Sequence, residues 1–291
     1  MAAESETSTF GVRSQGRVAR VFRFIQRRRS LALGGLFVGI IVLAAIFAPL
    51  ITHVDPTAQD LLYSLMPPSP DHPFGTDAYG RDILARVVYG ARISLVEVFL
   101  GVGIAVAAGV PLGLISGTLG GRIDQAIMWV MDIIFAFPGV ILAILIVSIL
   151  GTSLVNMLIA IAIFSLPIYA RLSRNVTLGI KRMEYVEAAS ALGASTLRIM
   201  VDHILRNSLG PIIVQATLTA GTVILTAASL SFLGLGAQPP LPEWGAMMSD
   251  GRDYIQVALW VSLFPGLAIT ITVLGFNILG DGLRDLLDPR T

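Results

Sequence analysis

The sequence predicts an all-α polytopic membrane protein with six transmembrane helices. Of its 291 residues, 55% are hydrophobic and only 13% are charged, about half the charged share of an average soluble domain. The apolar residues are gathered into six runs, each near the roughly 20 residues that a helix needs to cross about 30 Å of hydrocarbon. Because lipid offers no partners to backbone amides, runs of this length must be helical. The expected spans are residues 31–52, 93–117, 125–150, 153–170, 211–235 and 256–279.

The distribution of basic residues predicts the orientation of these spans. The first run is expected to be an uncleaved helix, since a signal peptide has an apolar core of only about 7–15 residues. Residues 1–30 precede it as a basic, arginine-rich segment. With this segment in the cytoplasm, sixteen of the 20 lysines and arginines lie on the cytoplasmic side and four lie outside. Positive residues collect on the cytoplasmic side, so both chain ends are predicted to be cytoplasmic.

The segments between the spans complete the expected domain organisation. Residues 53–92 are expected to form an extracytoplasmic loop that ends in a short surface helix over residues 77–92. Residues 93–279 form the core transmembrane domain, which is interrupted by a polar cytoplasmic loop at residues 171–207. Residues 280–291 are the expected cytoplasmic tail.

Several chemistries are excluded by residues that the chain lacks. It has no cysteine, which excludes disulfides, thiolate metal sites and cysteine nucleophiles. Its histidines, His53, His72 and His203, show no ligand spacing, and no catalytic grouping of serine, histidine and acid is present. A phosphate-binding P-loop requires Gly-Lys-Ser/Thr, yet the only lysine is Lys181, between isoleucine and arginine. The net charge of +1 predicts no nucleic-acid partner. We therefore expect a non-enzyme that holds no cofactor or metal and does not itself hydrolyse ATP.

The polar loop at 171–207 has a helical pattern interrupted by a turn signal. Apolar residues recur at helical spacing before Gly193, and glycine is a common residue just after a helix. Ser195 can cap a second helix, in which apolar residues recur at the same spacing. The pattern predicts two short amphipathic helices joined by a tight bend on the cytoplasmic face. Periodicity alone leaves open that the two helices lie on lipid.

The residues in this loop add a resemblance to the pattern. The string Glu187-Ala-Ala-Ser-Ala-Leu-Gly193, followed by Ile204-Leu205, resembles the EAA signature of ABC-importer permeases. That resemblance implies that the loop docks into a groove on an ATP-binding subunit. Arg206 stands where the family has proline, which puts the exit angle of the second helix in question. The matching positions are Glu187, Ala188, Ala189, Gly193, Ile204 and Leu205.

Other segments narrow the resemblance to one family. Residues 74–82 and 89–95, residues 230–245 and the tail at 280–290 are similar to the C-type permease subunits of dipeptide, oligopeptide and nickel ABC importers, also described as binding-protein-dependent transport system inner membrane components. The resemblance covers about residues 30–290.

This family resemblance implies a function and a set of partners. It implies a type I ABC importer permease fold in the bacterial inner membrane and a pore-forming role in importing dipeptides or oligopeptides, with glutathione or nickel as alternative solutes. The implied partners are a homologous B-type permease, two ATP-binding subunits that hold ATP and magnesium, an extracytoplasmic substrate-binding protein and the lipid bilayer.

Charged residues within or beside the spans suggest further sites. Ionisable residues inside spanning helices are functional candidates, so a gradient-driven carrier that uses Glu97 or Asp132 stays open as an alternative. Their structural interpretation places Glu97 near the headgroups beside Arg92 or Arg81, and Asp132 beside Arg122.

A last group of charged residues lies in the outer loop before the second span. Asp77, Arg81 and Asp82 are expected to be exposed at the outer surface. There they would contact the binding protein, support an outer gate, or simply be solvated.

Overall fold

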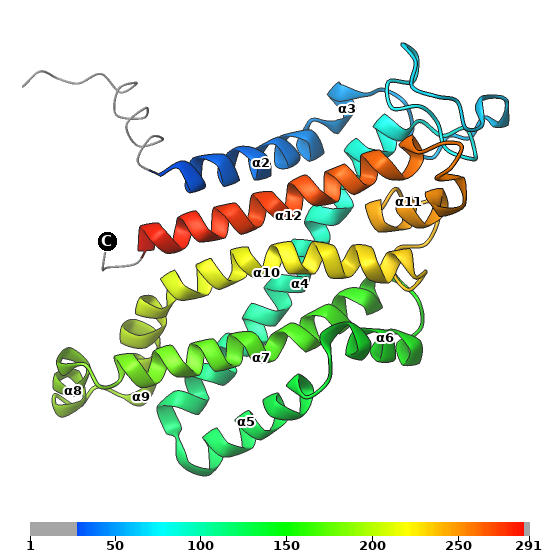
Figure 1. Cartoon of the computed structure of the whole chain (residues 1–291). Coiled ribbons are helices and arrows are strands. Elements are labelled where there is room, and N and C mark those ends of the chain that lie inside the picture. Colours follow the sequence, from blue (N-terminus) through cyan, green and yellow to red (C-terminus); the bar gives the residue numbers. More distant parts are fainter. Residues whose placement is uncertain (1–27, 288–291) are drawn as a thin grey trace, which may run out of the picture.

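The computed structural model describes residues 28–287, and this part of the chain is almost entirely helical. Five of its helices are long and apolar enough to cross a membrane, and one further pair of helices, bent by 89°, together passes the same test. The all-α membrane prediction is confirmed, and the six expected spans correspond to five helices and one bent pair (Figure 1). The expected basic segment at 1–30 and the end of the tail lie mostly outside the described residues.

The first and last spans pack side by side along their length (Figure 1). They are α2 (Arg29–Ile46), continued by α3 (Ala48–Ile51), and α12 (Trp260–Leu287). Gly34 of α2 lies directly against the backbone of Leu279, and Gly275 of α12 lies against Phe37 and Val38. Small residues at such positions let two membrane helices approach closely. The last helix also continues eight residues beyond its expected end at 279, into the predicted tail.

The longest helix is α4 (Ile83–Leu119), with 37 residues, which packs mainly against α7 (Leu154–Ile180). The Asp82 side chain caps it by accepting a hydrogen bond of 2.7 Å from the Ala85 amide. The prediction of a separate surface helix over residues 77–92 is therefore wrong. The helical part of this segment belongs to α4, because no proline stands between Ile83 and the expected span.

The expected single span at 125–150 is instead two helices that meet at 89°, α5 (Gly121–Phe135) and α6 (Gly139–Leu150). The bend falls at Ala136, Phe137 and Pro138. Proline lacks an N–H and disfavours the helical conformation of the residue before it. These two effects end α5 before the proline and restart the chain in a new direction.

The predicted pair of short helices in the polar loop is only half correct. The chain leaves α7 at Ile180, forms α8 (Glu184–Ala191), turns, and enters α9 (Thr196–Arg198). A π-helical segment, η2 (Ile199–Leu205), then continues directly into α10 (Arg206–Phe232). The second helix is thus the first part of a 37-residue span. Arg206, unlike the proline of the family pattern, retains its backbone N–H, so the helix continues through this position.

The two ends of the bundle carry different structures (Figure 1). One, here called the α8 end, carries α8 and α9. The other, the α11 end, carries the loop at 52–82 with its short helix η1 (Leu61–Tyr63), together with α11 (Trp244–Gly251) and η3 (Arg252–Tyr254).

Candidate functional site

The turn that follows α8 is a complete Schellman motif. The Ala194 amide donates to the Ala189 carbonyl at 3.1 Å, and the Gly193 amide donates to the Ser190 carbonyl at 3.0 Å. This pair of bonds satisfies the last carbonyls of a helix and requires a left-handed residue between them. Gly193 takes that conformation, with φ +83°. The sequence-based prediction of a helix that ends at Gly193 is confirmed.

The chain re-enters a helix directly after this turn. Ser195 caps α9, with its hydroxyl accepting from the Arg198 amide at 3.4 Å, as the sequence predicts. Leu192 and Leu197, on either side of the turn, expose 89% and 69% of their surface. Two leucines this exposed at the tip of a turn form an apolar surface that the described chain leaves uncovered.

The six residues of the EAA-like string separate into a surface and an anchor. Glu187, Ala188 and Gly193 are exposed and Ala189 is half-buried, so the α8 part of the string faces outward. Ile204 is fully buried in the core and Leu205 packs against that core. The structure therefore brings Glu187, the alanines and Gly193 together on the projecting turn, while the Ile-Leu pair attaches it to the bundle.

Three contacts hold the turn to the rest of the protein. The Lys181 ammonium donates to the Thr118 carbonyl at the end of α4, at 2.7 Å. The Asn207 amide donates to the Tyr185 hydroxyl at 3.2 Å, and the Tyr185 ring lies 6.1 Å from the His203 ring. Between α8 and the end of α4 is a hollow of about 660 Å³. Its lining comprises Thr118, Leu119, Lys181, Val186, Glu187, Ser190, Ala191, Thr196 and Ile199.

At the α11 end, Asp77, Arg81 and Asp82 are not exposed, and the expectation that they form a surface is wrong. Each exposes 4% or less of its surface. Arg81 donates through Nε to Asp77 at 2.6 Å, and Asp82 caps α4 while its other oxygen lies 2.9 Å from Nδ1 of His72. Charged side chains are buried only when they are paired, and here the loop at 52–82 folds over its own ions. These residues support the loop from inside.

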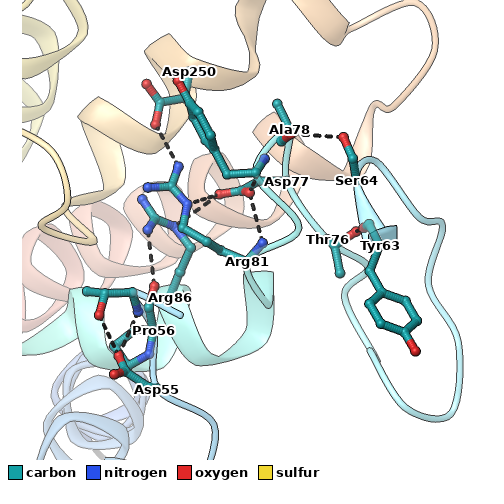
Figure 2. A network of polar contacts seen from close by, with 12 residues as sticks. Asp55, Pro56, Tyr63, Ser64, Thr76, Asp77, Ala78, Arg81, Arg86 and Asp250 are labelled. Carbon is teal, nitrogen blue, oxygen red and sulfur yellow. Dashed lines mark hydrogen bonds and ion pairs between the residues drawn. The ribbon is translucent and has the colours of Figure 1, made fainter. Parts of the chain in front are cut away.

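Two further residues, Arg86 and Asp250, complete this buried network (Figure 2). The Arg81 guanidinium also donates to Asp250 of α11 at 3.2 Å. The Arg86 Nε lies 3.6 Å from Asp77, and its Nη1 donates to the Pro56 carbonyl at 3.1 Å. The ions thus join the loop, α4 and α11. Asp250 cannot be linked to this loop from the sequence, because its pairing with Arg81 spans 169 residues.

The two acids considered inside the spans are not paired as expected. Glu97 is 1% exposed and lies near Glu243, with one carboxylate oxygen that has no hydrogen-bond partner among the described residues, while Arg92 donates to the Ala45 carbonyl at 2.6 Å. Asp132 pairs with Arg171 at 2.7 Å and not with Arg122. Neither acid is therefore paired with the arginine that its structural interpretation named. The Arg171 pairing joins α5 to α7, whose juxtaposition could not be read from the chain.

These features define a class, a polytopic helical membrane protein with a helical turn projecting from one end. In residues 28–287 no cluster of three or more histidine or acidic side chains could hold a metal ion.

The family model described as "Binding-protein-dependent transport system inner membrane component" matches residues 109–291, and "N-terminal TM domain of oligopeptide transport permease C" matches residues 17–68. The chain belongs to this family of inner-membrane ABC transporter permeases.

Named relatives match nearly the whole chain. The dipeptide transport system permease protein DppC of Alkalihalophilus pseudofirmus is 51% identical over 92% of this chain and 88% of its own length. The probable D,D-dipeptide transport system permease protein DdpC of Escherichia coli K12 is 44% identical over 100% of this chain and 98% of its own length. The glutathione transport system permease protein GsiD of Pectobacterium atrosepticum is 45% identical over 92% of this chain and 89% of its own length.

A solved structure matches the fold. It is an inward-facing conformation of the MetNI methionine ABC transporter, with a TM-score of 0.57 and 22% identity, covering 70% of this chain and 96% of the matched chain. The likeness extends to the fold, and the type I importer permease architecture expected from the sequence is confirmed.

Proposed function

We propose that this chain is a pore-forming subunit of an importer for dipeptides or oligopeptides, moved by ATP hydrolysis in separate subunits. The observation that carries the proposal is the projecting turn after α8. It has a rigid hydrogen-bonded geometry at Gly193, and an uncovered surface that combines the Glu187 carboxylate with Leu192 and Leu197. A helix presented in this way fits a groove on a partner that supplies donors for the carboxylate and apolar cover for the leucines.

The orientation follows from the same proposal. The α8 end faces the cytoplasm, where ATP is available, and the α11 end faces outward. The positive-inside distribution of basic residues supports this choice. In this orientation the loop at 52–82 and α11 lie where an extracytoplasmic binding protein delivers solute. Their buried ion network holds the shape of this end, and the exposed side chains around it make the contact.

The solute class rests on the relatives. Those matched over nine-tenths of this chain or more are described as permeases for dipeptides, for D,D-dipeptides or for glutathione, itself a small peptide. We therefore propose a short peptide as the solute, with glutathione as the alternative within that chemistry. The proposed assembly also contains a second, homologous permease, and two ATP-binding subunits that hold nucleotide and magnesium.

A co-purification experiment tests the docking role of α8. Glu187→Lys reverses a charge on the exposed turn, whereas Glu184→Lys makes the same change in the first turn of α8, outside the EAA-like string. The ATP-binding subunits should co-purify with the wild type and with Glu184→Lys, and be lost from Glu187→Lys. Equal recovery with both variants would contradict docking through Glu187.

Uptake measurements separate this function from a gradient-driven carrier. In cells whose ATP is preserved, an uncoupler should leave peptide uptake intact. Loss of uptake under those conditions would favour a gradient-driven carrier instead.

A further inference from the structure

The bend between α5 and α6 lies part-way along α7, and its residues 135–138 are exposed. A Cβ on Gly139, the first residue of α6, would stand 3.1 Å from the ring of Phe164. Phe164 is ten residues into α7, or about 15 Å along that helix at 1.5 Å per residue. The irregular backbone at 136–138 therefore occurs near the middle of a span. Such backbone is tolerated at this depth only where it is covered by protein or lines a water-filled cavity.

An exposed ion pair lies beside this bend. Asp132, one turn before it, accepts from the Arg171 guanidinium at 2.7 Å. The same guanidinium lies over the ring of Phe135, the last residue of α5, at 4.4 Å. The Asp132 side chain exposes 64% of its surface and the Arg171 side chain exposes 37%. Charged groups left facing hydrocarbon are costly, so this face of α5 and α7 does not face lipid.

The polar face continues from the bend toward the α8 end. One turn further along α7, Arg174 donates to both oxygens of Asp124 at 2.5 and 2.6 Å. Asp124 and Asp132 are eight residues apart and so share one face of α5. Along this face is a hollow of about 440 Å³, and a second one of about 460 Å³ lies at the bend itself. The hollow along α5 contains Asp124, Asp132 and Arg174 and so is polar, whereas the hollow at the bend is lined by apolar side chains.

We propose that the Asp132–Arg171 pair is a charged station on the solute path, at which the carboxylate takes the ammonium group of a short peptide and the guanidinium takes its carboxylate. This inference rests on the proposed function and names a site within it. Arginine binds carboxylates through two parallel hydrogen bonds. The Asp132–Arg171 ion pair must break before the peptide can bind, and this loss offsets part of the free energy of the two new ion pairs. Binding at the station is therefore weak enough for the solute to move on.

The absence of cysteine from the sequence makes the path directly testable. Asp132→Cys introduces a single thiol at the station, and Phe99→Cys introduces one at a 72% exposed apolar position of α4. In the assembled complex, a charged, water-soluble thiol reagent should modify Asp132→Cys at least tenfold faster than Phe99→Cys. Millimolar dipeptide should slow the first reaction and not the second. Equal rates at the two positions would show that this face is covered by lipid or by the second permease, and would overturn the proposal.

Transport provides the second measurement. Asp132→Asn and Arg171→Gln should each lower the rate of dipeptide uptake about tenfold, while the complex is recovered intact with its ATP-binding subunits. Arg171→Lys, which keeps the charge, should retain more uptake than Arg171→Gln. Normal uptake by both neutral variants, or loss of the assembled complex, would overturn the station. A wild-type complex that imports no peptide would instead contradict the proposed function, and the thiol-labelling rates would still report whether the face is wet.

Discussion

The Lys181 ammonium donates to the Thr118 carbonyl at 2.7 Å, and so joins the residue after α7 to the last turn of α4. Lys181 stands three residues before α8, so this bond lies at the base of the projecting turn. It also satisfies one of the carbonyls that a helix end leaves free. A cation there interacts favourably with the C-terminal end of the α4 dipole. Motion of α8 is therefore linked to α4 as well as to α7 and α10.

Lys181→Met should weaken the transmission of motion from α8 to α4. The methionine has nearly the same length but donates no hydrogen bond, so the α4 end loses its link to the turn. We expect ATP hydrolysis by the complex to persist while peptide uptake falls several-fold, which lowers the ratio of solute imported to ATP hydrolysed. Arg182→Met is the matched control, because the Arg182 side chain makes no ion pair or hydrogen bond within residues 28–287. An unchanged ratio in Lys181→Met would contradict the linking role.

Gly193→Val should uncouple ATP hydrolysis from uptake while the protein still inserts into the membrane. A Cβ at Gly193 would meet nothing within 4 Å, so the effect comes from the backbone, where the left-handed conformation costs an ordinary residue about 1–2 kcal/mol. Gly193→Asn separates two causes, since asparagine tolerates this conformation. We expect it to retain most of the uptake. Similar losses in both variants would mean that close approach of a partner, and not the turn conformation, requires glycine.

The sequence was informative where structure depends on near neighbours. Helical spacing, Gly193 and Ser195 predicted the α8 turn because a helix cap and a Schellman turn are formed by residues within six positions of one another. The same logic could have found the α5–α6 bend, since Pro138 stands inside the expected span. Pro138 alone does not distinguish a kink from a break, because proline is tolerated in membrane helices.

Burial and pairing of charged residues were predicted poorly. The sequence predicts that Asp77, Arg81 and Asp82 are exposed, because polar residues in a loop with proline turns are usually exposed. Asp250 pairs with Arg81 from 169 residues away, so this contact could not be predicted. Asp132 was assigned to Arg122, which is near in sequence, whereas α7 supplies Arg171 from 39 residues away. Tertiary contacts of this kind have no periodic signature in one sequence.

Arg81→Met should destabilise the α11 end. Removing one partner of a buried ion pair leaves the other charge uncompensated, at a cost of about 3–5 kcal/mol. We expect the lower part of that range, because Arg86 remains 3.6 Å from Asp77. Asp250→Asn should cost less, since the Asp250 side chain is 34% exposed. Thermal unfolding in detergent should therefore give a clearly lower midpoint for Arg81→Met than for Asp250→Asn, and the reverse order would contradict a buried network centred on Arg81.

Glu243 predicts a pH dependence of stability. Burial raises the pKa of its carboxyl above the ordinary value of 4.5, although the Gly245 and Ala246 amides donate to it at 2.8 and 2.7 Å. The Glu243 carboxyl ionises at lower pH in the unfolded chain than in the folded one. The stability of the folded state that depends on a protonated Glu243 is therefore fully present below the ordinary pKa of 4.5 and is lost as the pH rises through the pKa of the folded protein. Glu243→Gln does not titrate. The difference in unfolding midpoint, variant minus wild type, should increase from about pH 4.5 upward.

Asp253→Asn is the control for this effect, since the Asp253 side chain is 79% exposed. Its midpoint should follow that of the wild type across the same pH range. A Glu243→Gln curve parallel to the wild type would mean that ionisation of Glu243 is not linked to folding of the α11 end.

Gly34→Val should separate α2 from α12, whereas Gly35→Val should not. A Cβ at Gly34 would overlap the backbone of Leu279, and backbone cannot move aside as a flexible side chain can. A Cβ at the neighbouring Gly35 meets nothing within 4 Å. Both variants make the same chemical change one residue apart, so helix propensity and hydrophobicity are matched. The thermal unfolding midpoint in detergent measures the loss of this packing: it should fall sharply in Gly34→Val and stay near the wild-type value in Gly35→Val. Equal midpoints in the two variants would mean that α2 is held by contacts other than its close approach to α12.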